Sequence, residues 1–184
     1  MWLCTEWKID WDAIAAVATA VAAIIALIIW SLDKAQRRRE RAASAKLLAQ
    51  IMTTPFGAAQ VEIAKFRCVV RPLNGDQTYL AALKNDENVR QDLANKATKV
   101  RLDLPSQFLD KADIFTEKVN NRLANAFAQV NRLEKICSLL GDLPNSASET
   151  DINNHINSVL TQIKETEEAT REAFQALLEA GKSS

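Results

Sequence analysis

Apolar residues follow two different patterns along this chain. From residue 13 to residue 32 no position is charged and nearly all are apolar, whereas beyond residue 47 apolar residues recur at steps of three and four. Twenty residues at about 1.5 Å each are long enough to cross the roughly 30 Å hydrocarbon core of a bilayer. Steps of three and four place apolar side chains on one face of a helix. The pattern therefore predicts an all-α protein in which one N-terminal transmembrane helix precedes an antiparallel helical bundle.

The same pattern divides the chain into four predicted segments. These are a short N-terminus over 1–12, the transmembrane helix over 13–32, a juxtamembrane helix over 33–54 and the bundle over 55–184. We expect the membrane helix to run into the juxtamembrane segment without a break, because residues 33–54 are rich in good helix formers. Pro55 should close that helix, since proline disfavours helix in the residue before it. Four apolar residues should form its buried stripe: Leu47, Leu48, Ile51 and Met52.

Within the bundle we expect helices over about 56–70 and 77–102, separated by a turn at 71–76, with a break near Asn85. Pro105 is well placed to begin a helix of about 36 residues that Gly141 ends as a C-cap. A last helix should run over about 151–180. The last two helices carry matching apolar stripes and are joined by a short loop, which predicts a helical hairpin. Thr166 and Thr170 should weaken the stripe of the last helix.

Basic residues lie on one side of the predicted membrane helix. Lys8 stands alone before it, whereas five basic residues follow it: Lys34, Arg37, Arg38, Arg39 and Arg41. By the positive-inside rule this asymmetry places the C-terminal side in the cytoplasm. Trp11 and Trp30 flank the apolar stretch, where indole rings suit the headgroup level, and Trp2 and Trp7 add to the outer side. We therefore expect a single-pass protein of the inner membrane with its N-terminus outside and its basic flank against anionic lipids.

Small residues recur within the apolar stretch at every fourth position. Two adjoining rows share this spacing: Ala18, Ala22 and Ala26, and beside them Ala15, Thr19 and Ala23. Small side chains let two helices approach closely, and close packing drives association inside a bilayer. The rows therefore predict a homo-oligomer, although an Ala-rich span without a partner would have the same sequence.

Two other interpretations of the N-terminal region are weaker. A cleaved signal peptide needs a basic start and a small-residue cleavage site, but the first twelve residues hold one Lys and three acidic residues, and the apolar stretch ends in a charged run. A buried helix of a soluble protein would also be apolar. Nucleic-acid binding by residues 37–41 is not needed to explain the basic run, because membrane topology accounts for it, and we expect no nucleic-acid partner.

The amino-acid composition argues against most kinds of catalytic site. The 184 residues include four Gly, four Pro, one His and three Cys, with 23 basic against 23 acidic side chains. So few Gly and Pro do not suit the many turns of β-sandwiches and barrels. The chain has no C-x-x-C pair and no Gly-rich phosphate loop. We therefore expect no enzyme, no cofactor and no metal site.

Individual residues support this expectation. His155 is not preceded by an Arg at the spacing of four to six residues that one class of helical ribonucleases uses, since the nearest is Arg132. The carboxylates of the last two helices lack the Glu-x-x-His pairs of a di-iron bundle. Cys68 and Cys137 should be buried and reduced. Cys4, on the outside, could link two copies through a disulfide or remain a free thiol.

Two functions fit these predictions. The first is a membrane-anchored helical interaction or scaffold protein that self-associates through its transmembrane helix and binds a cytoplasmic protein partner. The second is an oligomeric pore-forming or membrane-disrupting effector, gated by its cytoplasmic bundle. No stretch carries the defining motif of a family. The layout as a whole is similar to that of many small bacterial membrane proteins, including membrane effectors of antiphage defence, and this similarity assigns no role to any residue.

Overall fold

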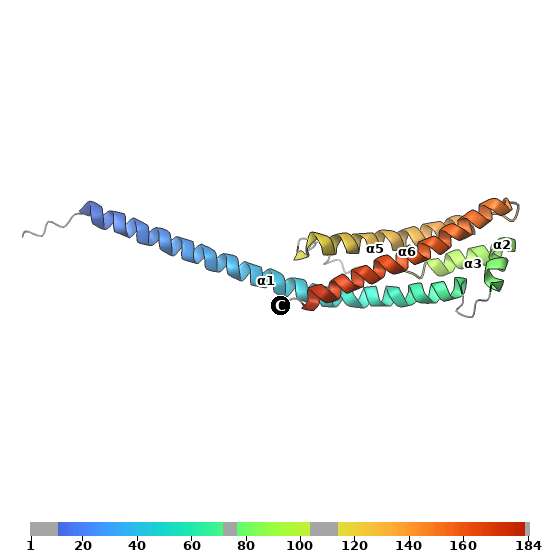
Figure 1. The fold of residues 1–184 in the computed structure, drawn as a ribbon, viewed down its shortest axis with the longest axis horizontal. Coiled ribbons are helices and arrows are strands. Elements are labelled where there is room, and N and C mark those ends of the chain that lie inside the picture. Colours follow the sequence, from blue (N-terminus) through green and yellow to red (C-terminus); the bar gives the residue numbers. More distant parts are fainter. Residues whose placement is uncertain (1–10, 72–76, 104–113, 183–184) are drawn as a thin grey trace, which may run out of the picture. The chain divides into compact units, whose positions relative to one another are not determined.

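The computed structural model describes residues 11–71, 77–103 and 114–182. Within these residues the secondary structure is helical and contains no strand. The elements are α1 (Trp11–Val70), α2 (Thr78–Asn85), α3 (Glu87–Ala97), α5 (Glu117–Gly141) and α6 (Glu149–Lys182), shown in Figure 1. The predicted all-α class and the single long apolar helix near the N-terminus are therefore confirmed. The predicted turn over 71–76 lies outside the described residues except for Arg71.

Helix α1 does not end before Pro55, as the sequence predicted. It spans 60 residues from Trp11 to Val70 and contains Pro55 within it. A proline inside a helix removes one backbone hydrogen bond and costs about 3 kcal/mol relative to alanine. Met52 and Phe56 on either side of it are fully buried, whereas Pro55 and Thr54 are at least partly exposed. Burial of the neighbouring side chains offsets the cost, and the helix continues.

The described chain falls into two compact units that divide between Ala43 and Ser44. Helix α1 contributes to both. Its residues from Ser44 onward belong to the second unit, together with α2, α3, α5 and α6. The second unit therefore begins before the Thr54/Pro55 boundary that the proline predicted, because Leu48, Ala49 and Met52 are already buried in its core.

One face of α1 supplies a large part of that core. Eight of its residues after Ser44 are buried: Leu48, Ala49, Met52, Phe56, Ala59, Ile63, Phe66 and Val70. At about 100° per residue these positions share one side of the helix. Leu47 and Ile51 lie outside this arc and are exposed, which corrects the prediction that they belong to the buried stripe. Residues adjacent in the sequence point about 100° apart on a helix, so they cannot all face one core. The side of α1 that is buried in the later turns determines which of these apolar residues are buried.

The break predicted near Asn85 is confirmed. Helix α2 ends at Asn85 and α3 begins at Glu87, with the extended residue Asp86 between them. The Asp86 carboxylate accepts a hydrogen bond of 2.8 Å from the backbone N–H of Asn88. An aspartate at this position satisfies one of the free N–H groups in the first turn of a helix. The polar residues around Asn85 thus end one helix and cap the next.

Helix α5 is shorter than the sequence predicted. It begins at Glu117 after Thr116, whose backbone is extended, so residues 114–116 are not part of an α-helix. The predicted start at Pro105 lies outside the described residues. A second correction concerns Gly141, which is the last residue of α5 rather than a cap beyond it. A Cβ atom on Gly141 would lie 2.9 Å from Cβ of Ala94 in α3, so glycine allows the two helices to approach closely here.

Helix α6 follows the prediction closely, spanning Glu149–Lys182, and packs against α5 (Figure 1). Thr166 and Thr170 are fully buried, so the stripe of α6 stays in the core where we expected it to weaken. Their hydroxyl groups donate hydrogen bonds to backbone oxygens of their own helix at 2.7 and 2.8 Å. The amide of Gln162, also buried, donates to the side-chain oxygen of Gln129 in α5 at 2.7 Å. These bonds satisfy polar groups that would otherwise be costly to bury.

Arg90 in α3 is fully buried, which nothing in the sequence indicated. Its guanidinium donates hydrogen bonds to the backbone oxygen of Leu83 at 3.1 Å and to that of Leu143 at 2.8 Å, and also to the Asn145 side chain at 3.0 Å. Leu83 lies in the last turn of α2, and Leu143 follows the end of α5. Carbonyl groups at helix C-termini lack partners within the helix and carry partial negative charge. Arg90 therefore joins two helix ends and the loop before α6.

Candidate membrane-binding segment

Helix α1 is the one helix in the described chain that is long and apolar enough to cross a membrane. This property is one of length and composition, and it belongs to the N-terminal part of α1. None of residues 14–32, the part of the apolar stretch whose side chains the structure describes, is buried. Ten large apolar side chains between residues 14 and 32 are exposed: Ile14, Val17, Val21, Ile24, Ile25, Leu27, Ile28, Ile29, Trp30 and Leu32. Soluble monomers rarely expose contiguous apolar surface on this scale, which marks such a surface as a site of interaction with protein or membrane.

The hydroxyl groups within this stretch are satisfied by its own backbone. Thr19 donates a hydrogen bond of 2.8 Å to the carbonyl oxygen of Ala15, and Ser31 donates one of 2.8 Å to that of Ile28. In hydrocarbon, a hydroxyl group without a partner would be costly. Both hydroxyl groups of the stretch are therefore already paired within α1. Thr19 also belongs to the assembly face predicted from the sequence, whereas no role was predicted for Ser31.

All six residues of the predicted assembly face are exposed on α1: Ala15, Ala18, Thr19, Ala22, Ala23 and Ala26. Helical spacing brings each row of three onto one strip of the helix surface. No described part of the chain covers either strip. The rows are therefore available to a second molecule, and the structure of one chain leaves the predicted self-association as a prediction.

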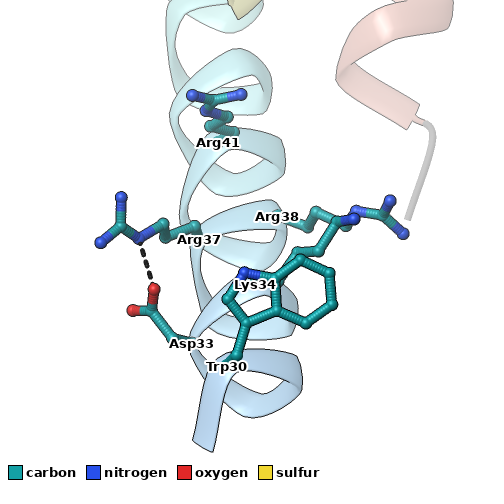
Figure 2. Close-up of a pocket in the computed structure, with 6 residues that line it drawn as sticks. All are labelled: Trp30, Asp33, Lys34, Arg37, Arg38 and Arg41. Atoms are coloured by element: carbon teal, nitrogen blue, oxygen red, sulfur yellow. Dashed lines mark ion pairs between the residues drawn. The ribbon is translucent and has the colours of Figure 1, made fainter. Parts of the chain in front are cut away.

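Basic residues gather directly after the apolar stretch, around an open hollow beside Trp30 (Figure 2). Six residues line the hollow: Trp30, Asp33, Lys34, Arg37, Arg38 and Arg41. The Lys34 ammonium lies 4.7 Å from the centre of the Trp30 ring, within range of a cation–π interaction. Four of the five predicted orientation residues and one of the predicted interfacial tryptophans, Trp30, thus meet at one site.

Arg37 and Arg39 differ from the other basic residues of this cluster. The Nε atom of Arg37 lies 2.9 Å from a carboxylate oxygen of Asp33 one turn earlier, which the sequence analysis did not anticipate. The pair is exposed and contributes little to stability, but it offsets one positive charge. Arg39 does not line the hollow. At about 100° per residue it lies on the opposite side of the helix from Trp30, which a helical projection of the sequence could have shown.

Several predicted residues cannot be placed in this site. Trp11 is the first residue of α1, and its side chain is outside what the structure describes. Trp2, Cys4, Trp7 and Lys8 lie before the described residues. The outer end of the predicted membrane helix therefore stays a prediction.

The histidine and cysteines that were considered as candidates for catalysis or metal binding do not form a reactive site in the described chain. The Nδ1 atom of His155 lies 2.9 Å from the backbone oxygen of Asp151 one turn earlier in α6. Among the residues that the structure describes, no group of His, Cys, Asp and Glu is arranged to hold a metal ion. Cys137 is buried as predicted and Cys68 is half-buried. Burial raises the pKa of the Cys137 thiol to about 12, so it is protonated at neutral pH.

No protein-family model matches this chain, and no curated protein and no solved structure has significant similarity to it. The exposed apolar stretch and the basic hollow that follows it are the two features of the described chain that point to a function.

Proposed function

We propose that this protein is a membrane-anchored helical scaffold. Residues 13–32 of α1 insert into the inner membrane, the residues from Ser44 onward form a cytoplasmic helical bundle that binds a protein partner, and the chain acts without catalysis. The observation that carries the proposal is the exposure of every large apolar side chain between residues 14 and 32. A stretch this long and apolar needs a nonaqueous surrounding, and no described part of the chain supplies one.

The energetics of insertion support the proposal. Nine Ile, Leu and Val residues lie in the stretch. At roughly −0.3 to −0.6 kcal/mol for each of them, insertion is favourable by about 3 to 5 kcal/mol. The basic residues on the C-terminal flank favour the orientation with that flank in the cytoplasm.

The partner surface is proposed on the outer faces of the last two helices. Phe127 and Leu139 in α5 and Leu178 in α6 are large apolar side chains that lie outside the buried stripes of these helices and are exposed. Large apolar and aromatic side chains are typical anchors of protein interfaces. The acidic surface of α6 adds charge selectivity. Part of this surface is already paired within the chain, because Nη1 of Arg67 in α1 lies 3.0 Å from Oε1 of Glu167.

Membrane integration and topology test the anchor. Reporter domains would be fused to each end of the full-length chain, and membranes would be extracted with alkaline carbonate. We expect the protein to stay in the carbonate-resistant fraction, with the C-terminal reporter accessible only from the cytoplasm. Release of the full-length chain by carbonate would overturn the proposal.

A pore-forming or membrane-disrupting effector is the second candidate, because α1 continues without a helical break from the apolar stretch into the core of the second unit. Such a helix could couple a cytoplasmic event to the bilayer. Ala18→Leu together with Ala22→Leu should abolish assembly and activity of an effector, whereas an anchor would tolerate both substitutions. Light scattering on the detergent-solubilised full chain separates the candidates further. A ring of five or more copies favours the effector, and a monomer or dimer favours the scaffold.

A further inference from the structure

We propose that Trp30, Lys34, Arg38 and Arg41 form a binding site for the phosphate of an anionic phospholipid headgroup. These four residues are called the headgroup site below. The proposal rests on the proposed membrane anchor and goes beyond it. Anchoring requires only that basic residues follow the apolar stretch, whereas a headgroup site requires that particular residues face one lipid.

The four residues of the headgroup site lie on one side of α1. Trp30, Lys34, Arg38 and Arg41 line the same hollow, and Figure 2 shows Lys34 and Arg38 on one side of it with Trp30 below and Arg41 above. Positions 30, 34, 38 and 41 fall within an arc of about 80° at 100° per residue. Arg39 lies about 180° from Trp30 and does not line the hollow. Membrane topology alone does not require basic residues to gather on one side of the helix.

Charge gives the second argument. The carboxylate of Asp33 pairs with Arg37 at one edge of the hollow and so offsets a single positive charge. Arg38 and Arg41 have no ion pair in the part of the chain that the structure describes, and Lys34 contacts the face of the Trp30 ring. Three cations therefore face a space that contains one paired carboxylate. A phosphate group, which can accept several charge-assisted hydrogen bonds, complements that arrangement.

Position selects a lipid over a soluble anion. Trp30 belongs to the apolar stretch and is exposed, and Leu27, about one turn earlier on the same side of α1, is exposed as well. An indole ring is best accommodated at the headgroup level of a bilayer. A ligand with a phosphate above this ring and acyl chains below it would contact both kinds of surface. An anionic phospholipid has that form, whereas free phosphate can use only the cations.

The test uses Trp30 as a reporter in the full chain. Trp2, Trp7 and Trp11 are replaced by Phe, and the protein is reconstituted in phosphatidylcholine vesicles that contain a small fraction of brominated lipid. Brominated phosphatidylglycerol is compared with brominated phosphatidylcholine at equal mole fractions. We expect the anionic lipid to quench Trp30 fluorescence at a severalfold lower mole fraction. Inorganic phosphate at 10 mM should leave this preference unchanged, and its loss on adding phosphate would instead indicate a site for soluble anions.

Arg38→Gln and Arg39→Gln are the matched pair. Each removes one positive charge, and the two positions are adjacent in the sequence but point to different sides of α1. Arg38→Gln should weaken the preference for the anionic lipid by about fivefold, the usual effect of one charge near a membrane surface, and Arg39→Gln should weaken it much less. Equal losses would overturn the headgroup site and leave the anchor in place. Release of the protein by carbonate would overturn the anchor and the site together.

Discussion

The two parts of helix α1 place apolar side chains in opposite surroundings. Before Ala43, apolar residues occur all around the helix and every large one that the structure describes is exposed. After Ser44, they concentrate on one face, and Met52, Phe56 and Ile63 on that face are fully buried. Both parts belong to one helix, so helix formation does not distinguish them. The second part is therefore covered by its own protein, whereas no described residue covers the first part, which is why we propose that a bilayer does.

A charged residue introduced into the first part of α1 should have a much larger effect than one introduced into the second part. Val21 is 48% exposed and Val61 is 53% exposed, which makes them matched sites on one helix. Val21→Arg together with Ile25→Arg adds about 5 to 7 kcal/mol to the cost of insertion, which exceeds the favourable term of about 3 to 5 kcal/mol. We expect this pair to be lost from carbonate-extracted membranes.

The control is Val61→Arg, which should leave membrane integration intact and change the free energy of unfolding by no more than about 0.5 kcal/mol. If the Val21 and Ile25 pair integrates as well as the unchanged protein, the apolar part of α1 does not lie in a bilayer.

Truncating apolar side chains should destabilise the protein when the side chain lies in the second part of α1, but not when it lies in the first part. Phe56→Ala removes a fully buried ring and should lower the free energy of unfolding of the second unit by about 3 to 5 kcal/mol. Ile24→Ala in the exposed part should leave it unchanged. Urea unfolding of the detergent-solubilised protein, followed by circular dichroism, measures both. Similar losses from the two substitutions would mean that Ile24 also packs against protein.

Pro55 offers a smaller effect of opposite sign. It lies within α1 and is only partly exposed, and its cost is offset by the buried residues around it. Pro55→Ala restores a backbone hydrogen bond and should raise the free energy of unfolding by about 1 to 3 kcal/mol. The same urea experiment measures the change. A decrease would show that the proline itself contributes to packing.

Alkaline pH should affect the core that covers the second part of α1, and only above pH 9. Burial raises the pKa of the Cys137 thiol from 9.0 to about 12, and burial together with Asp92 and Cys137 raises that of Tyr79 from 10.0 to about 12. The unfolded chain therefore loses these protons first, so stability is constant below about pH 9 and falls as pH rises toward 12.

Urea midpoints measured between pH 7 and pH 11 check this dependence. Iodoacetamide at pH 8 should modify the half-buried Cys68 faster than Cys137, because the buried thiol is both inaccessible and protonated. A loss of stability between pH 7 and pH 8, or equal rates of modification, would contradict the burial of Cys137.

Most helices could be predicted from the sequence, because apolar periodicity and helix breakers are local signals. The break at Asp86 and the extent of α6 follow from such signals. Three features depend on contacts between distant residues and could not be predicted. Pro55 is tolerated because its neighbours are buried, Gly141 is required by the approach of Ala94, and Arg90 is buried because two helix ends present carbonyl groups to it.

The candidate site was predicted in composition but not in arrangement. The sequence identified the apolar stretch and the five basic residues after it, since both are continuous along the chain. It treated the five basic residues as equivalent. Helical phase separates Arg39 from Arg38, and the side-chain conformation of Asp33 decides which arginine is paired. The first distinction was available from a helical projection, whereas the second required coordinates.

The hydrogen bonds between Gln129 and Gln162 have a consequence for how α5 and α6 recognise each other. Most other buried residues of the two helices are apolar, and leucine, valine and isoleucine would still pack after one helix slid by a turn along the other. Such a slip would separate the buried amide of Gln162 from the Gln129 side-chain oxygen that accepts its hydrogen bond. A buried amide without a hydrogen-bond partner is costly. The polar layer of Gln129 and Gln162 therefore fixes the register of α5 against α6.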